Sequence, residues 1–158
     1  MPAEIIKAPK QPPIRLGGRQ RKSVFLAGSI EMGKAEDWQT RLTKELDDLD
    51  IDIFNPRRDD WDSSWVQSID NKQFSKQVYW ELARLDEATV IALYFDPTTQ
   101  SPISLLELGL HAKDDKLVVF CPEGFWRKGN VDIVCERYRI GRMQNFSEFV
   151  HAVRERLQ

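Results

Sequence analysis

Uninterrupted apolar runs alternate along the chain with segments in which apolar residues recur every three or four positions. The apolar runs predict strands at residues 24–28, 51–54, 89–95, 116–121 and 138–140. The three-to-four-residue spacing predicts helices at about residues 35–49, 71–87, 101–113, 131–136 and 147–157. Because alternating strands and helices form a parallel sheet with helices on both faces, we expect an α/β fold. The specific expectation is a flavodoxin-like (Rossmann-like) three-layer sandwich whose five-stranded parallel sheet has the order 2-1-3-4-5.

The first 22 residues differ in composition from the rest of the chain. They hold four of the eight prolines, a Gly-Gly pair and the basic residues Arg19, Arg21 and Lys22. A segment of this kind gains little by folding, so residues 1–22 are predicted to be a flexible N-terminal leader. Residues 23–158 have the length and composition of one globular domain.

The overall charge argues against two classes of partner. The 23 basic residues nearly balance the 25 acidic ones, and the formal net charge is -2. A polymeric nucleic acid or an anionic membrane would need a stronger basic field, so we expect a small-molecule partner. The sequence has no apolar run of membrane-spanning length and no apolar core of a signal peptide, which favours a cytoplasmic protein.

The cysteine and histidine content argues against a metal centre. Cys121 and Cys135 do not form a CxxC motif, and His111 and His151 are the only histidines. We therefore expect buried free thiols, no metal and no cofactor.

The predicted topology gathers several loops at one edge of the sheet. Ligands of such folds bind at the carboxyl ends of the strands, where the strand order reverses. This rule brings together residues 28–34, 96–101 and 122–130, with residues 55–65 at their side. Within the first loop, Gly28, Ser29 and Ile30 offer backbone N–H groups at a strand-to-helix turn, which is by itself a weak signal.

Glu107 is the strongest candidate for chemistry. It falls in the second turn of a helix that opens with Ser101 as a favoured N-cap and Pro102 at the first helical position. Its helical neighbours are nearly all leucine or isoleucine, so we expect its carboxylate in a place where water is scarce. Burying an ionised group without partners costs roughly several kcal/mol of folding free energy. This cost favours a functional role for Glu107 over a structural one.

A second acid follows the same pattern one helix earlier. Glu81 lies on the apolar stripe formed by Phe74, Val78, Leu85 and Ala88. A structural carboxylate and a sugar-binding carboxylate are equally good interpretations of Glu81. In the loop after the second predicted strand, Trp61 and Trp65 stand among acids and arginines, where a planar base could stack or the tryptophans could simply anchor the loop.

These residues resemble the nucleoside 2-deoxyribosyltransferase superfamily, which includes the deoxynucleoside 5'-phosphate N-hydrolases. The resemblance covers about residues 23–140. The matching segments are Val24–Ile30, Asn55-Pro56-Arg57, Trp80-Glu81, Asp96–Gly109 and Val118–Asn130, and the string Ser101-Pro-Ile-Ser-Leu-Leu-Glu-Leu-Gly109 is the most specific. The closest likeness is to the deoxyribosyltransferase-like branch, and it implies the same layered fold.

The resemblance implies a role for each matching position. Glu107 corresponds to the nucleophile that forms a covalent glycosyl-enzyme, and Ser101 and Glu81 correspond to groups that bind the sugar or its phosphate. Asn130 and Asp132 correspond to a loop that reaches the site of a neighbouring subunit, which implies a homodimer or a higher homo-oligomer. The full set of expected substrate-binding residues is Gly28, Ser29, Ile30, Asn55, Arg57, Trp61, Glu81, Ser101, Asn130 and Asp132.

Two positions depart from the family's pattern. Phe25 stands where many relatives have a tyrosine whose hydroxyl touches the catalytic glutamate, and Glu31 stands where the phosphate-using hydrolases have arginine. The second change favours a nucleoside over a 5'-nucleotide, unless Arg57 or Arg58 supplies the charge. Three hypotheses result: cleavage or transfer of the N-glycosidic bond of a (deoxy)ribonucleoside, a non-catalytic nucleoside- or nucleotide-binding module, and an N-glycosidase acting on a 5'-nucleotide or NAD.

Overall fold

The computed structural model describes residues 1–18, 20–30, 36–58 and 64–158. Its strands form one sheet in which every pairing is parallel. The strands are β1 (Glu4–Lys7), β2 (Lys22–Gly28), β3 (Ile51–Asn55), β4 (Val90–Tyr94), β5 (Leu117–Phe120) and β6 (Arg142–Met143). The helices are α1 (Trp38–Glu45), α2 (Lys72–Glu87), α3 (Pro102–His111), α4 (Lys128–Arg137) and α5 (Phe146–Leu157). The α/β class and the parallel sheet are therefore as predicted.

The number and order of strands differ from the prediction. The sheet has six strands in the order β1-β3-β2-β4-β5-β6, not five in the order 2-1-3-4-5. The additional strand, β1, lies within residues 1–22, which the sequence analysis treated as a leader. Four residues with a single buried isoleucine, Ile6, give too short a pattern to be recognised, and pairing with β3 is what makes them a strand.

The last strand is also displaced from its predicted place. Residues 138–140 do not form a strand, because α4 continues to Arg137 and Tyr138 caps it. The strand follows at Arg142–Met143 and pairs with Val119 and Phe120 of β5. Such a short edge strand is defined by its neighbour more than by its own composition.

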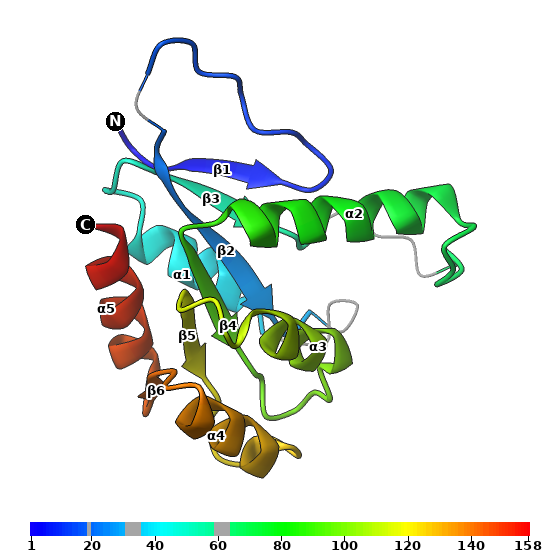
Figure 1. The fold of residues 1–158 in the computed structure, drawn as a ribbon, viewed down its shortest axis with the longest axis vertical. Coiled ribbons are helices and arrows are strands. Elements are labelled where there is room, and N and C mark those ends of the chain that lie inside the picture. The colour runs from blue at the N-terminus through cyan, green and yellow to red at the C-terminus, as the bar shows by residue number, and fades with distance from the viewer. Residues whose placement is uncertain (19, 31–35, 59–63) are drawn as a thin grey trace.

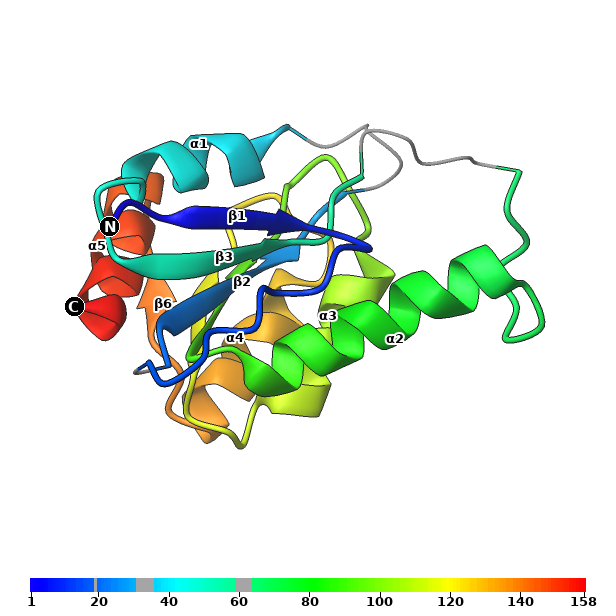
Figure 2. The ribbon, with the colours of Figure 1, turned by 90° about the horizontal axis from the view of Figure 1, so that it is seen from above.

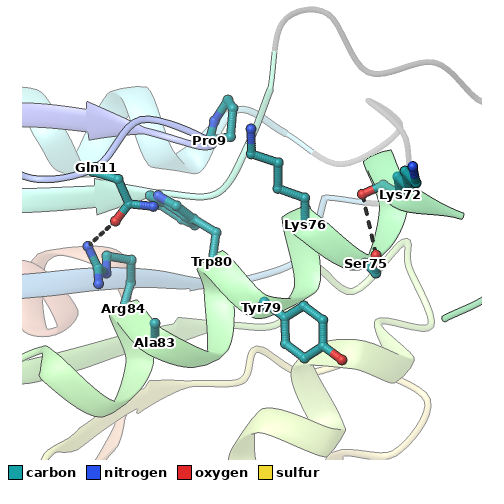
Figure 3. A pocket seen from close by; sticks show the side chains of 9 residues that line it. All are labelled: Pro9, Gln11, Lys72, Ser75, Lys76, Tyr79, Trp80, Ala83 and Arg84. Atoms are coloured by element: carbon teal, nitrogen blue, oxygen red, sulfur yellow. Dashed lines mark hydrogen bonds between the residues drawn. The ribbon is translucent and has the colours of Figure 1, made fainter. Parts of the chain in front are cut away.

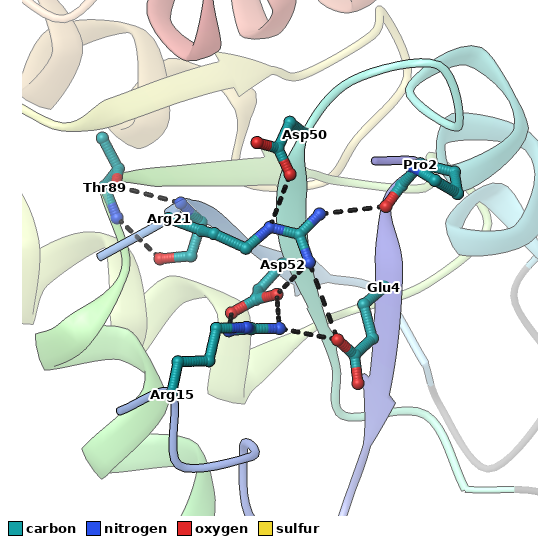
Figure 4. A network of polar contacts seen from close by, with 8 residues as sticks. Pro2, Glu4, Arg15, Arg21, Asp50, Asp52 and Thr89 are labelled. Atoms are coloured by element: carbon teal, nitrogen blue, oxygen red, sulfur yellow. Dashed lines mark hydrogen bonds and ion pairs between the residues drawn. The ribbon is translucent and has the colours of Figure 1, made fainter. Parts of the chain in front are cut away.

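A network of charged side chains holds the N-terminal segment against β3 (Figure 4). Arg15 donates to Asp52 at 2.7 Å and to Glu4 at 2.6 Å. Arg21, whose side chain is only 7% exposed, pairs with Asp50 at 2.9 Å and with Asp52 at 3.3 Å. Because the two arginines share Asp52, the connection between β1 and β2 is fixed at two points to the same residue of β3.

Two apolar cores lie on opposite faces of the sheet (Figures 1 and 2). On one face, α1 and α5 pack through Trp38, Leu42, Phe149 and Val153 against alternate residues of the central strands. On the other, α2, α3 and α4 cover the remaining strand residues, and the helical contributors are Trp80, Leu85, Leu108, Val131 and Cys135. All residues of β4 are buried, as its unbroken apolar run predicted.

Among the described residues, no helix combines the length and the apolar character that crossing a bilayer requires.

Candidate active site

The turn after β2 is built around a close approach of two strands. Gly28 has φ 143°, and a Cβ atom there would overlap the backbone of Tyr94 and lie 2.8 Å from a ring carbon of Trp38. Only glycine fits such a position. The next residue, Ser29, donates its backbone N–H to the Tyr94 carbonyl at 3.0 Å, so the chain leaves β2 directly beside the end of β4.

Three hydroxyl groups meet at this point. Ser29 Oγ accepts from the Asp96 N–H at 2.8 Å and from Thr99 Oγ1 at 3.0 Å. Ser101 Oγ shares hydrogen bonds with Ser29 Oγ and, at 2.7 Å, with Thr99 Oγ1. All three side chains are buried. Ser29 and Ser101 were predicted as site residues from the sequence, but Thr99 was not, because its one indication was a hydroxyl in the loop after a buried strand.

Ser101 serves this cluster instead of capping its helix. It is the residue before α3 and Pro102 is at the first helical position, as predicted, but Ser101 has φ 47° and ψ 55° and its side chain makes no cap hydrogen bond. The left-handed conformation is uncommon for serine and costs on the order of 1–3 kcal/mol. The hydroxyl therefore points to the neighbouring loops and not along the helix.

The helix α3 carries its polar residues on the buried side. Ile103, Leu106 and Leu110 are more than half exposed, and the buried face consists of Ser104, Glu107, Leu108 and His111. The sequence analysis found no polar face in this helix, and the structure shows one that points inward. Because the polar side of α3 faces the interior and its apolar side faces solvent, the Glu107 carboxylate is buried.

Glu107 is 7% exposed, and no hydrogen bond or ion pair of its carboxylate is found among residues that the structure describes. Burial, together with the negative charge of Glu81, raises the pKa of Glu107 well above its usual range. Burial also raises the pKa of Glu81 to about 7, with a hydrogen bond from Gln77 acting in the opposite direction. The carboxylate on α3 thus senses the charge of the acid on α2.

Gln77 connects this pair to the loop after β3. The Gln77 side chain is buried, donates to the Pro56 carbonyl at 3.2 Å and accepts from Arg58 at 3.5 Å. It stands one helical turn before Glu81 and hydrogen-bonds with it. Gln77 was not predicted as a site residue. Its position four residues before a buried acid could have indicated that its amide reaches that acid.

Asn55 and Arg57 have visible structural roles. Asn55 Oδ1 accepts from the Arg57 N–H at 3.0 Å, which closes the turn after β3. The Arg57 guanidinium donates to Gln39 Oε1 at 3.1 Å and to the Glu36 carbonyl at 3.2 Å. These bonds direct Arg57 toward the start of α1, on the opposite side of the sheet from α2 and α3.

The remaining predicted residues lie apart from the acid pair or outside the described residues. Ile30 is half-buried just beyond Ser29. Asn130 is exposed on α4, and Asp132 pairs with Lys128 at 3.0 Å; within the described ranges neither bonds to Glu81, Ser101 or Glu107. Trp61 and Glu31 are outside the described residues.

Metal chemistry finds no support in the part of the chain that is described, where no three His, Cys, Asp or Glu side chains gather as a ligand set. Cys121 and Cys135 are free and buried, as predicted. Burial raises the pKa of the Cys121 thiol to about 12 and that of Cys135 to about 11, so neither is a thiolate at neutral pH.

The site therefore combines a dry carboxylate, a second acid and a group of hydroxyls at the carboxyl edge of the sheet. A family model described as "Nucleoside 2-deoxyribosyltransferase like" matches residues 21–125, which is more than half of the chain. The chain belongs to the nucleoside 2-deoxyribosyltransferase-like family. A comparison with curated proteins finds no match.

The family match contains the residues that the geometry singles out. Residues 21–125 include the Gly28 turn, the hydroxyl cluster, Glu81 and Glu107. The match ends before Asn130 and Asp132, so it lends nothing to these two. The nucleoside 2-deoxyribosyltransferase-like region is thus the part of the chain that forms the candidate active site.

Proposed function

We propose that this protein cleaves or transfers the N-glycosidic bond of a (deoxy)ribonucleoside through a covalent glycosyl ester on Glu107. The observation that carries the proposal is the burial of the Glu107 carboxylate without a cation or a hydrogen-bond donor among the described residues. Isolated buried charge is costly, and functional sites are where such a cost is tolerated. Membership of the nucleoside 2-deoxyribosyltransferase-like family makes a nucleoside the favoured substrate class.

In the proposed reaction, a Glu107 oxygen attacks the anomeric carbon as the bond between that carbon and the base nitrogen breaks. The base leaves with the bonding electrons and takes a proton from water. Water or a second base then displaces the glutamate and restores its carboxylate, which is the retaining double displacement of glycosidases.

Charge explains why a dry, partner-free carboxylate suits this step. Burial and the charge of Glu81 raise the pKa of Glu107, so few groups among the described residues stabilise its ionised form. The anomeric carbon becomes cationic in the transition state, and a carboxylate in a low-dielectric site attracts that charge strongly. Donors that already satisfied Glu107 would weaken the attraction.

Glu81 and Ser101 are proposed to hold the sugar. Glu81 is close enough to raise the pKa of Glu107, so one sugar can reach both acids. Ser101 immediately precedes α3 and stands six residues before Glu107, a rise of about 9 Å along a helix, and we propose that the sugar contacts both residues. The half-buried Glu81 carboxylate can accept from ribose hydroxyls.

A non-catalytic nucleoside-binding module is the second candidate, and Phe25 favours it. Phe25 is fully buried on β2 and packs against Trp80 with ring centroids 6.2 Å apart. Its ring has no hydroxyl to orient Glu107. Binding of a nucleoside without release of its base would support this alternative.

The deciding experiment measures base release by chromatography from a panel of nucleosides, 5'-nucleotides and NAD. We expect turnover of at least one nucleoside, and Glu107→Ala should abolish it while the circular dichroism spectrum is unchanged. Glu155→Ala, at an exposed position of α5 on the opposite face of the sheet, is the matched control. Unchanged turnover in Glu107→Ala would remove the mechanism, and turnover of NAD or nucleotides alone would replace the substrate class.

We also propose that the protein is a homo-oligomer. The exposed stripe of Ile103, Leu106 and Leu110 on α3 supports this, because apolar residues spaced along one helical face suit contact with a second chain. Light scattering after size exclusion should give a mass above the 18.4 kDa of one chain. Leu106→Lys should lower it, whereas Lys44→Glu on α1 should not.

A further inference from the structure

A cavity lies on a face of α2 that does not include Glu81. It has a volume of about 420 Å³ and is open to solvent on one side. Its wall is formed by Pro9 and Gln11 of the N-terminal segment and by residues of α2, namely Lys72, Ser75, Lys76, Tyr79, Trp80, Ala83 and Arg84 (Figure 3). The segment that follows β1 thus completes a cavity that α2 alone could not form.

The charges around this cavity all have one sign. Lys72, Lys76 and Arg84 line it, and no acidic residue does. Neither lysine has an ion pair or a hydrogen bond from its ammonium group among the described residues, whereas Arg84 is held by Glu87 at 3.1 Å and Gln11 at 3.3 Å. Because Glu87 pairs with Arg84, the two lysines are the cations that give this cavity a local positive field in a chain with a net charge of -2.

Two of the cations, Lys72 and Lys76, are spaced for a compact anion with more than one charged oxygen group. Lys72 and Lys76 are one helical turn apart, a rise of about 6 Å, and Arg84 lies about 12 Å beyond Lys76. In Figure 3, Lys76 extends toward Pro9 and Arg84 toward Gln11, on either side of Trp80. Lysine ammonium groups are point charges that bind phosphate oxygens from several directions.

The cavity also has an aromatic base. Trp80 is 4% exposed and is fixed by a 2.6 Å hydrogen bond from its indole N–H to the Lys10 carbonyl. Tyr79 is 60% exposed, and its ring points away from Trp80 and Gln11 (Figure 3). A rigid wall and flexible cationic arms together suit a small phosphorylated molecule.

We propose that this cavity binds the phosphate or diphosphate group of a small molecule, at a site separate from Glu107. The two sites lie on different faces of α2, since Trp80 lines the cavity while Glu81 interacts with Glu107. The proposal does not depend on the reaction at Glu107.

Inorganic pyrophosphate is the probe, because it has no sugar and no glycosidic bond. Isothermal titration calorimetry of the full chain at low ionic strength should detect binding, and Lys72→Glu with Lys76→Glu should weaken the affinity at least tenfold. Lys44→Glu with Lys113→Glu is the matched control, since it changes the net charge equally at exposed positions away from the cavity.

The outcomes separate cleanly. Loss of affinity in the cavity double variant and retention in the control double variant support the proposal. Absence of binding to the wild-type chain, or an equal loss in both double variants, overturns it. A Glu107→Gln chain should bind pyrophosphate as the wild type does, so failure of the proposed reaction would leave this result unaffected.

Discussion

The two faces of the sheet bury different kinds of side chain. On the side of α1 and α5, Trp38 lies 5.5 Å from Tyr94 and 6.2 Å from Phe149, between ring centroids. On the side of α2 and α3, the interior holds Glu81 and Glu107 with no cation beside either among the described residues. The first face is arranged for packing, and the second retains groups that disfavour folding unless they are neutral.

The contrast between these faces separates the residues that stabilise the fold from those of the candidate active site. Residues on the aromatic face stabilise the fold through burial and close packing, so substitutions there should lower the free energy of unfolding. The acid-bearing face gives up some stability in order to keep a carboxylate dry. Four predictions follow from this difference, in decreasing order of expected effect.

The largest effect is expected from Glu107→Gln. We expect base release to fall by about a thousandfold or more, because an amide cannot act as the nucleophile. The free energy of unfolding, measured by urea denaturation, should stay equal or rise, because the buried ionisable group is gone. Lower stability with full activity would mean that Glu107 is a structural acid and would erase the contrast between the faces.

Trp38→Ala should mainly lower the free energy of unfolding, the reverse of what is expected for Glu107→Gln. Trp38 is fully buried and donates its indole N–H to the Ser29 carbonyl at 3.1 Å. We expect a loss of about 3–5 kcal/mol in unfolding free energy. Trp126→Ala, at a position that is 51% exposed, is the comparison and should cost far less. An equal loss in the two variants would show that the aromatic face does not dominate stability.

Ser29→Ala tests the cluster that joins the two faces. The substitution removes the acceptor for the Asp96 N–H and for Thr99 Oγ1. Thr99 Oγ1 keeps the Asp96 carbonyl as an acceptor at 2.9 Å, so the Asp96 N–H is the donor that loses its partner, which should cost about 1–3 kcal/mol in thermal or urea unfolding. Ser75→Ala on α2, where the hydroxyl bonds only within its own helix in the described structure, should be near neutral. A neutral Ser29→Ala would show that the cluster is not coupled to folding.

The smallest effect is a pH dependence of stability. The folded-state pKa of Glu81 is raised from 4.5 to about 7 and that of Glu107 is raised too, so the folded protein holds these protons more tightly than the unfolded chain. The contribution of the pair is therefore complete below about pH 4.5 and decreases as the pH rises toward 7 and beyond.

A variant without the two acids separates the contribution of Glu81 and Glu107 to stability from that of the other carboxylates. Urea unfolding of the wild type and of Glu81→Gln with Glu107→Gln across pH 4.5–8 should show that the double variant gains stability relative to the wild type as pH rises. A constant difference between the two chains would contradict the raised pKa values.

Most of the helices and strands could be predicted from the local pattern of apolar and polar residues. The predicted helix at residues 71–87 agrees with α2 to within one residue, because an Asn cap and a long apolar stripe define it locally. The central strands were found for the same reason: residues buried on both faces form unbroken apolar runs. The string around Glu107 indicated both a buried carboxylate and the nucleoside 2-deoxyribosyltransferase-like family.

Other features depended on contacts between distant segments. β1 exists because β3 pairs with it and because Arg15 and Arg21 share Asp52, over separations that no local pattern records. The burial of Glu107 was expected, but the exposure of Ile103 and Leu106 on the other side of α3 was not, since a helix apolar on nearly every side does not reveal which apolar residues face solvent.

The sequence by itself determined the alternation of strands and helices and the identity of the exceptional acid, because both are local properties of the chain. Only the tertiary structure decided that Glu81 lies near Glu107, that Thr99 joins Ser29 and Ser101, and that Arg57 points toward α1. The physical reason is that pKa shifts and hydrogen bonds fall off within a few ångströms, and the packing of the elements alone sets those distances.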